Sequence, residues 1–198
     1  MAPWFRRART PPDSVRAIVL GVGNPGQQYA GTRHNVGFAV IDELRSSLAA
    51  RPHSTRHQAR VWLAGDVLLA KPQTFVNLSG RAARQLCAAF QVAPADLLVL
   101  ADDVNLKLGQ LRLRREGSAG GHKGLRSIAQ ELGTQEIPRL RVGVGRPDNL
   151  QDDLVDHVLS RFPPDQEQLA RETIRRAAAC VEVYLRDGVE AAMNQFNS

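Results

Sequence analysis

The stretch RAIVLGVGNPGQQYAGTRHN at residues 16–35 decides how this chain folds. Residues 16–22 form a short apolar run that is rich in β-branched side chains and has Gly21 near its end, which predicts a buried strand. Residues 23–35 are dominated by turn-forming residues. Over residues 36–50 apolar side chains recur at helical spacing. This part of the sequence therefore predicts a strand, a long turn and a helix in succession.

The rest of the sequence continues to alternate between strands and helices. Residues 61–64 and 67–70 flank Gly65-Asp66, a strong signal for a two-residue β-hairpin. Further strands are predicted over 97–101, 110–114 and 140–144, and the second alternates so that Arg112 and Arg114 share one face. Helices are predicted over 77–90 with Asn77 or Ser79 as N-cap, over 125–132 and 152–159, from 165 onward, and after Gly188. Together the elements predict an α/β fold, with a twisted mixed β-sheet flanked by helices and a helical C-terminal segment.

Length and composition are those of one globular domain. The chain has 198 residues, of which 43% are hydrophobic and 23% charged, which is too apolar for a disordered chain and too charged for a membrane protein. No uncharged apolar stretch approaches the roughly 18 residues that a spanning helix needs. We expect residues 16–198 to form the domain and residues 1–15 a flexible basic arm. The arm lacks the apolar core of a secretory signal, and Pro11-Pro12 disfavours an organellar transit peptide.

Cysteine and histidine spacing gives no sign of a metal or a disulfide. Cys87 and Cys180 lie far apart without CxxC spacing, so a reducing, cytoplasmic setting is expected. His53 and His57 are four residues apart in a polar segment that offers no third ligand. We therefore expect no metal and no cofactor.

Positive charge is concentrated in the first three quarters of the chain. Residues 1–147 hold 21 of the 26 lysines and arginines and 10 of the 20 acids, whereas residues 148–198 hold 5 and 10. The body thus carries +11 and the tail −5, giving +6 overall. A one-sided basic domain attracts polyanions, of which nucleic acid is the commonest in the cytosol. The alternative is a solvated, arginine-rich surface without such a partner.

Two glycine-rich segments lack features that nucleotide-binding loops need. Residues 21–26 (GVGNPG) match GxGxxG after a strand, but Pro25 and the following turn delay the helix that would hold a pyrophosphate. Residues 117–124 (GSAGGHKG) lack P-loop spacing because His122 separates Gly121 from Lys123. Their backbone N–H groups can still hold an anion at the start of the next helix; a merely tight turn is the alternative.

His34 is the strongest catalytic candidate among the residues themselves. It lies after the first strand and just before a helix, where a histidine can act as a general base if a carboxylate orients it. Asp102 follows the strand over 97–101, and sites in open α/β sheets cluster at the carboxyl ends of such strands, so the two side chains can meet. A nucleophilic mechanism is less attractive because GxSxG is absent and Cys87 lies on an apolar helix face. Water activated by a histidine is the remaining hydrolytic option.

Five motifs, in order, resemble the bacterial-type peptidyl-tRNA hydrolase family. They are GVGNPGQQYAGTRHNVGF at 21–38, KPQTFVNLSG at 71–80, LVLADDVNLKLG at 98–109, GSAGGHKGL at 117–125 and LRVGVGRP at 140–147. Their order and spacing agree with the family from about residue 17 to the C-terminus. The resemblance implies a monomeric, single-domain α/β enzyme that hydrolyses the ester joining a peptide to the 3′ end of tRNA. Such an enzyme recycles tRNA from stalled translation and uses neither metal nor nucleotide.

The resemblance also implies roles for individual residues. His34 would be the general base that activates water, and Asp102 its orienting carboxylate. The remaining implied residues contact the substrate: Asn24 and Asn77 at the peptide and the reacting carbonyl, Tyr29 near the terminal nucleotide, Phe75 and Lys123 elsewhere in the cleft, and Arg114 and Arg141 at the 5′-phosphate end of the tRNA.

The sequence departs from the usual family pattern at three positions. Lys123 replaces a substrate-binding asparagine, which alters one expected contact, while Asn105 replaces a common aspartate and Val76 a common methionine. Two other function classes stay open: a non-catalytic RNA-binding relative, since the fold is reused as an RNA-splicing cofactor in chloroplasts, and a dinucleotide-binding oxidoreductase. Because His34 and Asp102 are both present, the enzyme is favoured over the RNA-binding relative.

Overall fold

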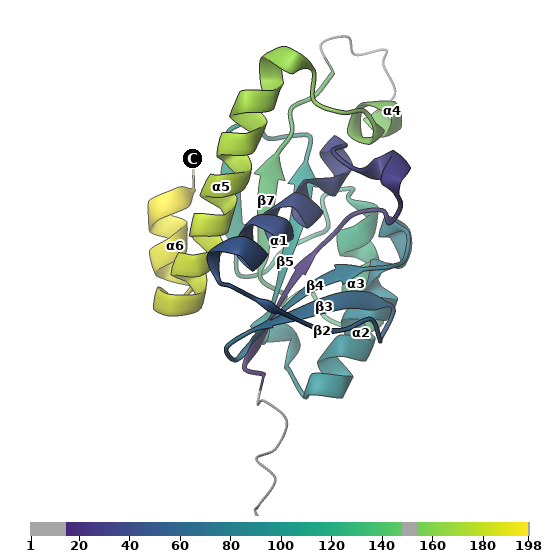
Figure 1. Cartoon of the computed structure of the whole chain (residues 1–198), viewed down its shortest axis with the longest axis vertical. Coiled ribbons are helices and arrows are strands. Elements are labelled where there is room, and N and C mark those ends of the chain that lie inside the picture. The colour runs from purple at the N-terminus through teal and green to yellow at the C-terminus, as the bar shows by residue number, and fades with distance from the viewer. Residues whose placement is uncertain (1–14, 148–153, 198) are drawn as a thin grey trace, which may run out of the picture.

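A seven-stranded mixed sheet lies between two groups of helices in the computed structural model, which describes residues 15–147 and 154–197 (Figure 1). The strands are β1 Ala17–Gly21, β2 Arg51–Ser54, β3 Ala59–Ala64, β4 Val67–Pro72, β5 Leu97–Asp103, β6 Leu111–Arg114 and β7 Arg139–Gly143. The helices are α1 Val36–Ser47, α2 Ser79–Phe90, α3 Lys123–Leu132, α4 Leu154–Leu159, α5 Pro164–Asp187 and α6 Val189–Phe196. Short 3-10 helices lie at η1 Gln27–Tyr29, η2 Arg33–Asn35, η3 Val76–Leu78 and η4 Pro94–Asp96. The predicted arm, apart from Val15, and the start of the helix predicted from 152 lie outside the described residues.

The strand order β2-β3-β4-β1-β5-β7-β6 confirms the predicted mixed sheet. β1 pairs in parallel with β4 and β5, and β5 pairs in parallel with β7. The hairpin of β3 and β4 and the edge strands β2 and β6 add antiparallel pairs. The carboxyl ends of β1, β5 and β7 therefore meet at one edge of the sheet, where open α/β folds place their sites.

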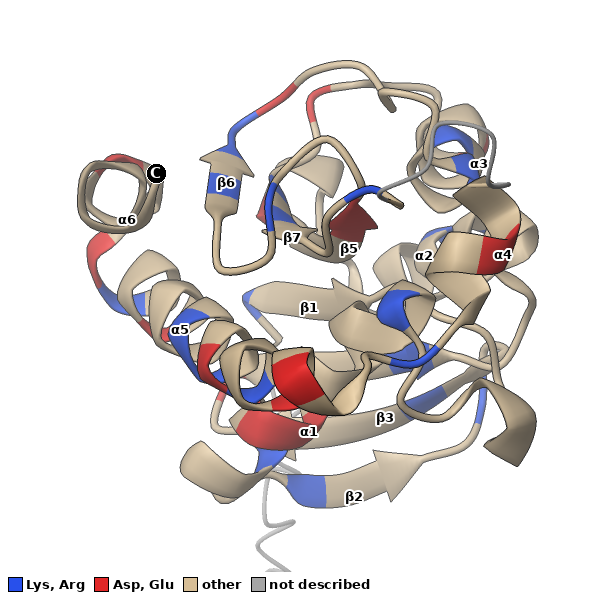
Figure 2. Ribbon diagram, turned by 90° about the horizontal axis from the view of Figure 1, so that it is seen from above, with Lys and Arg blue, Asp and Glu red and all other residues tan. Residues whose placement is uncertain are grey.

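Both faces of the central strands are buried. Ile18 and Leu20 of β1 belong to the core beneath α2 and α3, whereas Val19 belongs to the core beneath α1, α5 and α6. Seen from above, the two helix groups lie on opposite sides of the sheet (Figure 2). This double burial explains why β1 and β5 are continuous apolar runs in the sequence. None of the described helices has the length and apolar character needed to cross a membrane.

A glycine brings the start of α1 onto the strand ends. A Cβ atom on Gly37 would lie 2.6 Å from the carbonyl oxygens of both Leu100 and Val22, which is far inside van der Waals contact. Only glycine therefore lets the first turn of α1 rest on the ends of β1 and β5. As a consequence η2, which precedes α1 directly, lies at the carboxyl edge of the sheet.

Three details of the predicted elements were wrong. Neither Asn77 nor Ser79 caps α2, because Leu78 occupies the N-cap position without a side-chain bond and Ser79 is buried in the first turn. α3 begins at Lys123 rather than Leu125, because the His122 side chain caps it. Residues 51–54, expected within a polar loop, form the edge strand β2. Arg51, Pro52 and His53 are exposed there, so no apolar pattern marked the strand.

Candidate active site

Three side chains meet where β5 ends. Asp102 is only 4% exposed, and its Oδ1 atom lies 2.7 Å from His34 Nδ1 and 2.9 Å from His122 Nε2. His34 comes from η2 and His122 from the turn before α3. The structure thus brings together His34 and Asp102, as expected from their positions after two central strands. His122 was not among the residues predicted for the site.

The hydrogen bonds of His122 determine where its proton lies. The amides of Gly124 and Leu125 donate to Nδ1 at 3.1 and 3.2 Å, so this nitrogen carries a lone pair. A neutral imidazole then has its proton on Nε2 and donates it to Asp102. The network therefore fixes the tautomer of His122, with Nδ1 as the acceptor and Nε2 as the donor.

The same tautomer bears on whether the cluster suits a metal. His34, Asp102 and His122 offer ligand atoms within 4.8 Å of one another. A metal at His122 Nε2 would need the lone pair there and would move the proton to Nδ1, directly opposite the amides of Gly124 and Leu125. The donor set therefore fits a hydrogen-bond network better than a metal centre.

Asp102 is held as a carboxylate. Burial alone would raise its pKa, but the interactions with His122 and then His34 outweigh burial and hold the pKa below the ordinary value of 3.8. An ionised Asp102 must accept from His34 Nδ1, which leaves the lone pair of His34 on Nε2. The His34 side chain is 15% exposed, and Nε2 has no partner among the described residues. This is the geometry of an oriented base that faces solvent.

Asn24 is fixed by bonds to two other segments. Its backbone N–H donates to Asn35 Oδ1 at 2.8 Å, and Asn35 Nδ2 donates back to the Asn24 carbonyl at 3.0 Å. The amide of Val76 donates to Asn24 Oδ1 at 3.0 Å. Within the described part of the chain the Nδ2 group of Asn24 has no acceptor. Asn24 therefore presents a donor in a fixed orientation, and its partner Val76 is the residue that replaces the methionine of the family pattern.

Aromatic and amide side chains lie on η1 and at the start of η3. Phe75 is 55% exposed, and the Tyr29 ring meets it edge to face with 6.4 Å between centroids. Asn77 is exposed in η3 and free of any α2 capping bond. An exposed aromatic ring packed against a half-buried one, beside polar groups, is typical of a binding surface.

Four arginines share one face at the edge formed by β6 and β7. Arg112 is paired in register with Arg141, and Arg114 with Arg139, so like charges face one another across the strands. Arg112 and Arg114 are exposed. Arg141 donates to Asp103 Oδ2 at 3.0 Å and to the Ser118 carbonyl at 2.8 Å, so part of its donor capacity is already used. Blue segments of β6 and β7 lie beside the acidic end of β5 in Figure 2.

Lys123 and Asn105, the other two departures from the family pattern, have different surroundings. Lys123 is the exposed first residue of α3, where the helix dipole disfavours a cation unless an anion is near. Asn105 donates from its backbone and its side chain to Asp103 Oδ1 at 2.8 and 3.1 Å, and it accepts from Arg146. The amide thus fills a bonding role in which a second carboxylate would repel Asp103.

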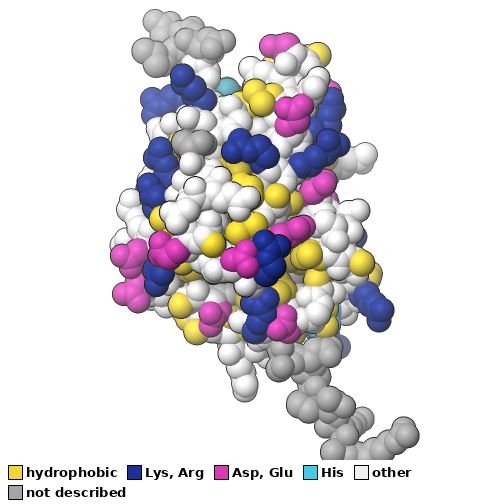
Figure 3. All heavy atoms as spheres, turned by 90° about the vertical axis from the view of Figure 1, so that its left-hand side faces the viewer, with side chains coloured by type: hydrophobic (Ala, Val, Ile, Leu, Met, Phe, Trp, Pro, Cys, Tyr) yellow, Lys and Arg dark blue, Asp and Glu magenta, His cyan; other side chains and the backbone are white. Residues whose placement is uncertain are grey.

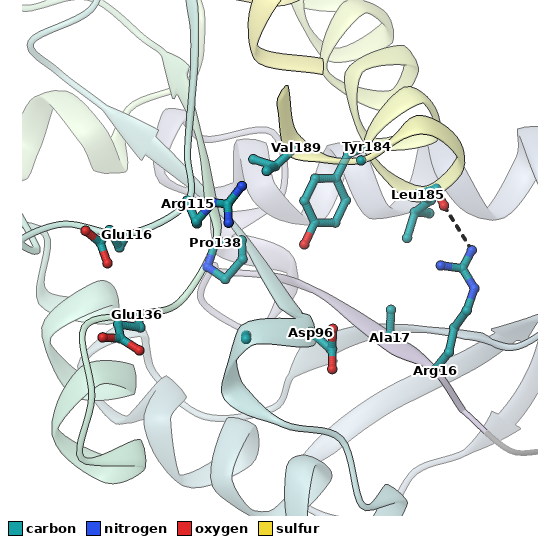
Figure 4. A pocket seen from close by; sticks show the side chains of 12 residues that line it. Arg16, Ala17, Asp96, Arg115, Glu116, Glu136, Pro138, Tyr184, Leu185 and Val189 are labelled. Carbon is teal, nitrogen blue, oxygen red and sulfur yellow. Dashed lines mark hydrogen bonds between the residues drawn. The ribbon is translucent and has the colours of Figure 1, made fainter. Parts of the chain in front are cut away.

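One cavity borders this site, and a second lies far from it. A groove of about 800 Å³ borders it on the α1 side, lined by Asn24, Thr32 and Phe162 among others. A second cavity of about 630 Å³ lies at the opposite edge of the sheet, where β1 and β5 begin (Figure 4). Tyr184 points into it from α5, and two arginines and three acids line it. Its charge is net negative, so it does not suit a polyanion.

The molecule closely matches known proteins. The peptidyl-tRNA hydrolase family model matches residues 18–198. A peptidyl-tRNA hydrolase of Chloroflexus aurantiacus is 48% identical over 185 residues, which cover 91% of this chain and 98% of that protein. The one from Alkaliphilus metalliredigens is 44% identical over 184 residues, with the same coverage. The crystal structure of peptidyl-tRNA hydrolase from Acinetobacter baumannii superposes with a TM-score of 0.85 at 32% identity, covering 93% of this chain and 96% of that chain.

Proposed function

Because this chain belongs to the peptidyl-tRNA hydrolase family, we propose that His34 activates the water that cleaves the ester between peptide and tRNA. His34 Nε2 takes a proton from water as the water oxygen attacks the ester carbonyl carbon. The bond from that carbon to the 3′ oxygen of the ribose then breaks, and the imidazolium returns a proton to the departing oxygen. The products are the free peptide acid and tRNA. The observation that carries this mechanism is the 2.7 Å bond between His34 Nδ1 and Asp102, which directs Nε2 outward.

Amide groups complete the proposed chemistry. An ester of this kind is activated, so an oriented base and a few hydrogen-bond donors suffice without a strong nucleophile. Asn24 Nδ2 and Asn77 would donate to carbonyl oxygens and accept from peptide N–H groups, which any peptide sequence offers. Tyr29 and Phe75 would pack against the terminal nucleotide or the peptide next to it.

The tRNA would be held through its phosphates. Arg114 and Arg141 lie on the arginine face of β6 and β7, where Arg141 forms an ion pair with Asp103. Arg141 keeps donors beyond those given to Asp103 and Ser118, since a guanidinium has five. Contacts to phosphate are indifferent to base sequence, which suits an enzyme that must accept many tRNAs. Lys123 would add one further anion contact at the start of α3.

We further propose the setting in which the enzyme acts. The substrate arises when translation stalls, so the protein would bind RNA, support ribosome rescue and act as a monomer in the cytoplasm. The buried thiols Cys87 and Cys180, both free, suit a reducing compartment.

Replacing the base tests the mechanism directly. His34→Ala is expected to lower kcat by roughly 10²- to 10⁴-fold, the usual worth of a positioned base, with unchanged melting temperature. Asp102→Asn should cost less, because an amide still orients the ring but does not stabilise its cation. The measurement is release of tRNA from N-acyl-aminoacyl-tRNA under single-turnover conditions, with His53→Ala as a surface histidine control.

Two results would contradict the proposal. Near-normal turnover of purified His34→Ala protein would show that His34 is not the base that activates water. Wild-type protein that binds tRNA without cleaving the ester would instead favour the non-catalytic RNA-binding relative.

A further inference from the structure

Arg33, the neighbour of His34, is buried and bound to a distant part of the chain. It is 5% exposed, and its guanidinium donates to Ser160 Oγ at 2.7 Å, to the Arg161 carbonyl at 2.6 Å and to Gln166 Oε1 at 3.1 Å. The guanidinium also stacks on the Phe162 ring, 4.9 Å from its centroid. Ser160, Arg161 and Phe162 belong to the connection between α4 and α5, and Gln166 lies in the first turn of α5. The side chain of Arg33 thus links η2 to residues 127 to 133 positions away.

The backbone of η2 is linked to the same connection. Arg33 N–H donates to the Ser160 carbonyl at 3.0 Å, and Thr32 forms an isolated antiparallel bridge with Arg161. The three consecutive residues of η2 therefore bind three different segments of the chain. Arg33 binds the connection between α4 and α5, His34 binds β5 through Asp102, and Asn35 binds the loop after β1 through Asn24.

The partners of Arg33 are unusual for a buried cation. In the part of the chain that the structure describes, no carboxylate lies among its acceptors, and Nε has no partner. Burial lowers the pKa of Arg33, although a guanidinium stays protonated. Burying an unpaired charge costs free energy. A neutral side chain would cost less free energy to bury at this position. The guanidinium of Arg33 therefore points to a role that needs several hydrogen-bond donors in a fixed arrangement.

We infer that Arg33 is a positioning residue for His34. A 3-10 turn of three residues has little stability of its own, so its shape depends on what its side chains bind. Arg33 binds the turn to the segment between α4 and α5 while His34 binds Asp102 of β5, so we expect the position of His34 Nδ1 against Asp102 to depend on both contacts. The inference rests on the proposed function for its kinetic part, because Arg33 has no contact with the reacting atoms.

The test compares Arg33→Gln with Arg186→Gln, which removes an exposed arginine at the end of α5. Two readouts are needed: single-turnover kcat and KM on N-acyl-aminoacyl-tRNA, and the NMR signal of the His34 Nδ1 proton held by Asp102. In Arg33→Gln we expect kcat to fall about tenfold or more, as for a misplaced catalytic group, with KM within about twofold. The Nδ1 signal should weaken or disappear. Arg33→Lys, which keeps the charge but loses the fork, should recover little.

If Arg33→Gln does not fold, a substitution of its hydrogen-bond partner Gln166 gives an independent test. Gln166→Ala removes one acceptor of Arg33 and should lower kcat less, without adding fully to Arg33→Gln in the double variant. A lower melting temperature with unchanged kcat and an intact Nδ1 signal would overturn the inference and leave Arg33 a purely structural link. If wild-type protein fails to hydrolyse the ester, the proposed function falls, but the NMR comparison still decides whether Arg33 positions His34.

Discussion

At the scale of single residues, His122 combines two tasks that can be separated by substitution. It caps α3 through Nδ1 and donates to Asp102 through Nε2. His122→Ala should cost roughly 1 kcal/mol of stability, the typical worth of a cap, and also lower kcat. His122→Asn should restore the cap, because asparagine is a good N-cap, but its shorter side chain should leave Asp102 without the second donor. Urea denaturation and single-turnover kinetics measure the two effects, and parallel recovery of both by asparagine would contradict this division.

Lys123 is the second residue with a specific expectation. An ammonium group only donates, whereas the asparagine of the family pattern also accepts, so Lys123 cannot reproduce an accepting bond but can contact an anion. Lys123→Asn should keep most of kcat while lowering the salt dependence of tRNA binding by up to about one unit of slope. Binding titrations between low and moderate salt measure this, with Arg126→Gln on the exposed side of α3 for comparison. A gain of cleavage in Lys123→Asn over an inactive wild type would indicate that the chain had lost catalysis.

At the scale of elements, the position of α1 depends on Gly37. A methyl group there would meet the carbonyl oxygens of Leu100 and Val22 at 2.6 Å. Because both contacts are backbone atoms, α1 must shift away, and η2 must follow. We expect Gly37→Ala to lose about 1–3 kcal/mol, as overpacked cores do, and to lower kcat of the folded protein. Denaturation gives the first quantity and kinetics well below the melting temperature the second. Unchanged turnover would show that η2 is held in place without α1.

The elements were largely predictable from sequence, and the site only in part. Buried strands such as β1 and β5 carry apolar runs, and Gly65-Asp66 marks its hairpin with a positive φ of 60° at Gly65. His34 and Asp102 were predictable because each follows a central strand. His122 was not, because its position depends on a loop that Arg139 holds through the Gly117 and Gln135 carbonyls. The role of Arg33 was missed because all the partners of its side chain lie more than 120 residues away in the sequence. A histidine directly before a helix start was the available signal for His122.

At the scale of the whole molecule, positive charge is unevenly placed. The first 147 residues carry +11 and the remainder −5. On the side formed by α5 and α6, basic and acidic side chains are interspersed (Figure 3). The arginines of β6 and β7 instead face one another, and among them Arg141 forms an ion pair with Asp103. A polyanion should therefore approach the edge that also carries the candidate site, because arginines are concentrated there.

Because of this asymmetry, we expect the loss of one arginine to affect tRNA binding at β6 and β7 but not on α5. Arg114→Ala, at an exposed position of β6, should raise KM more than it lowers kcat and reduce the salt slope of tRNA binding by about one. Arg186→Ala, on α5 beside Asp187, should leave that slope unchanged. Arg141→Ala should lower the slope too, but it also leaves the buried Asp103 unpaired, so its stability must be measured alongside. Equal slopes for wild type and for a variant lacking both Arg114 and Arg141 would show that these arginines are only solvated charges. The tRNA would then have to bind elsewhere, since a phosphate contact cannot be removed without releasing fewer counterions.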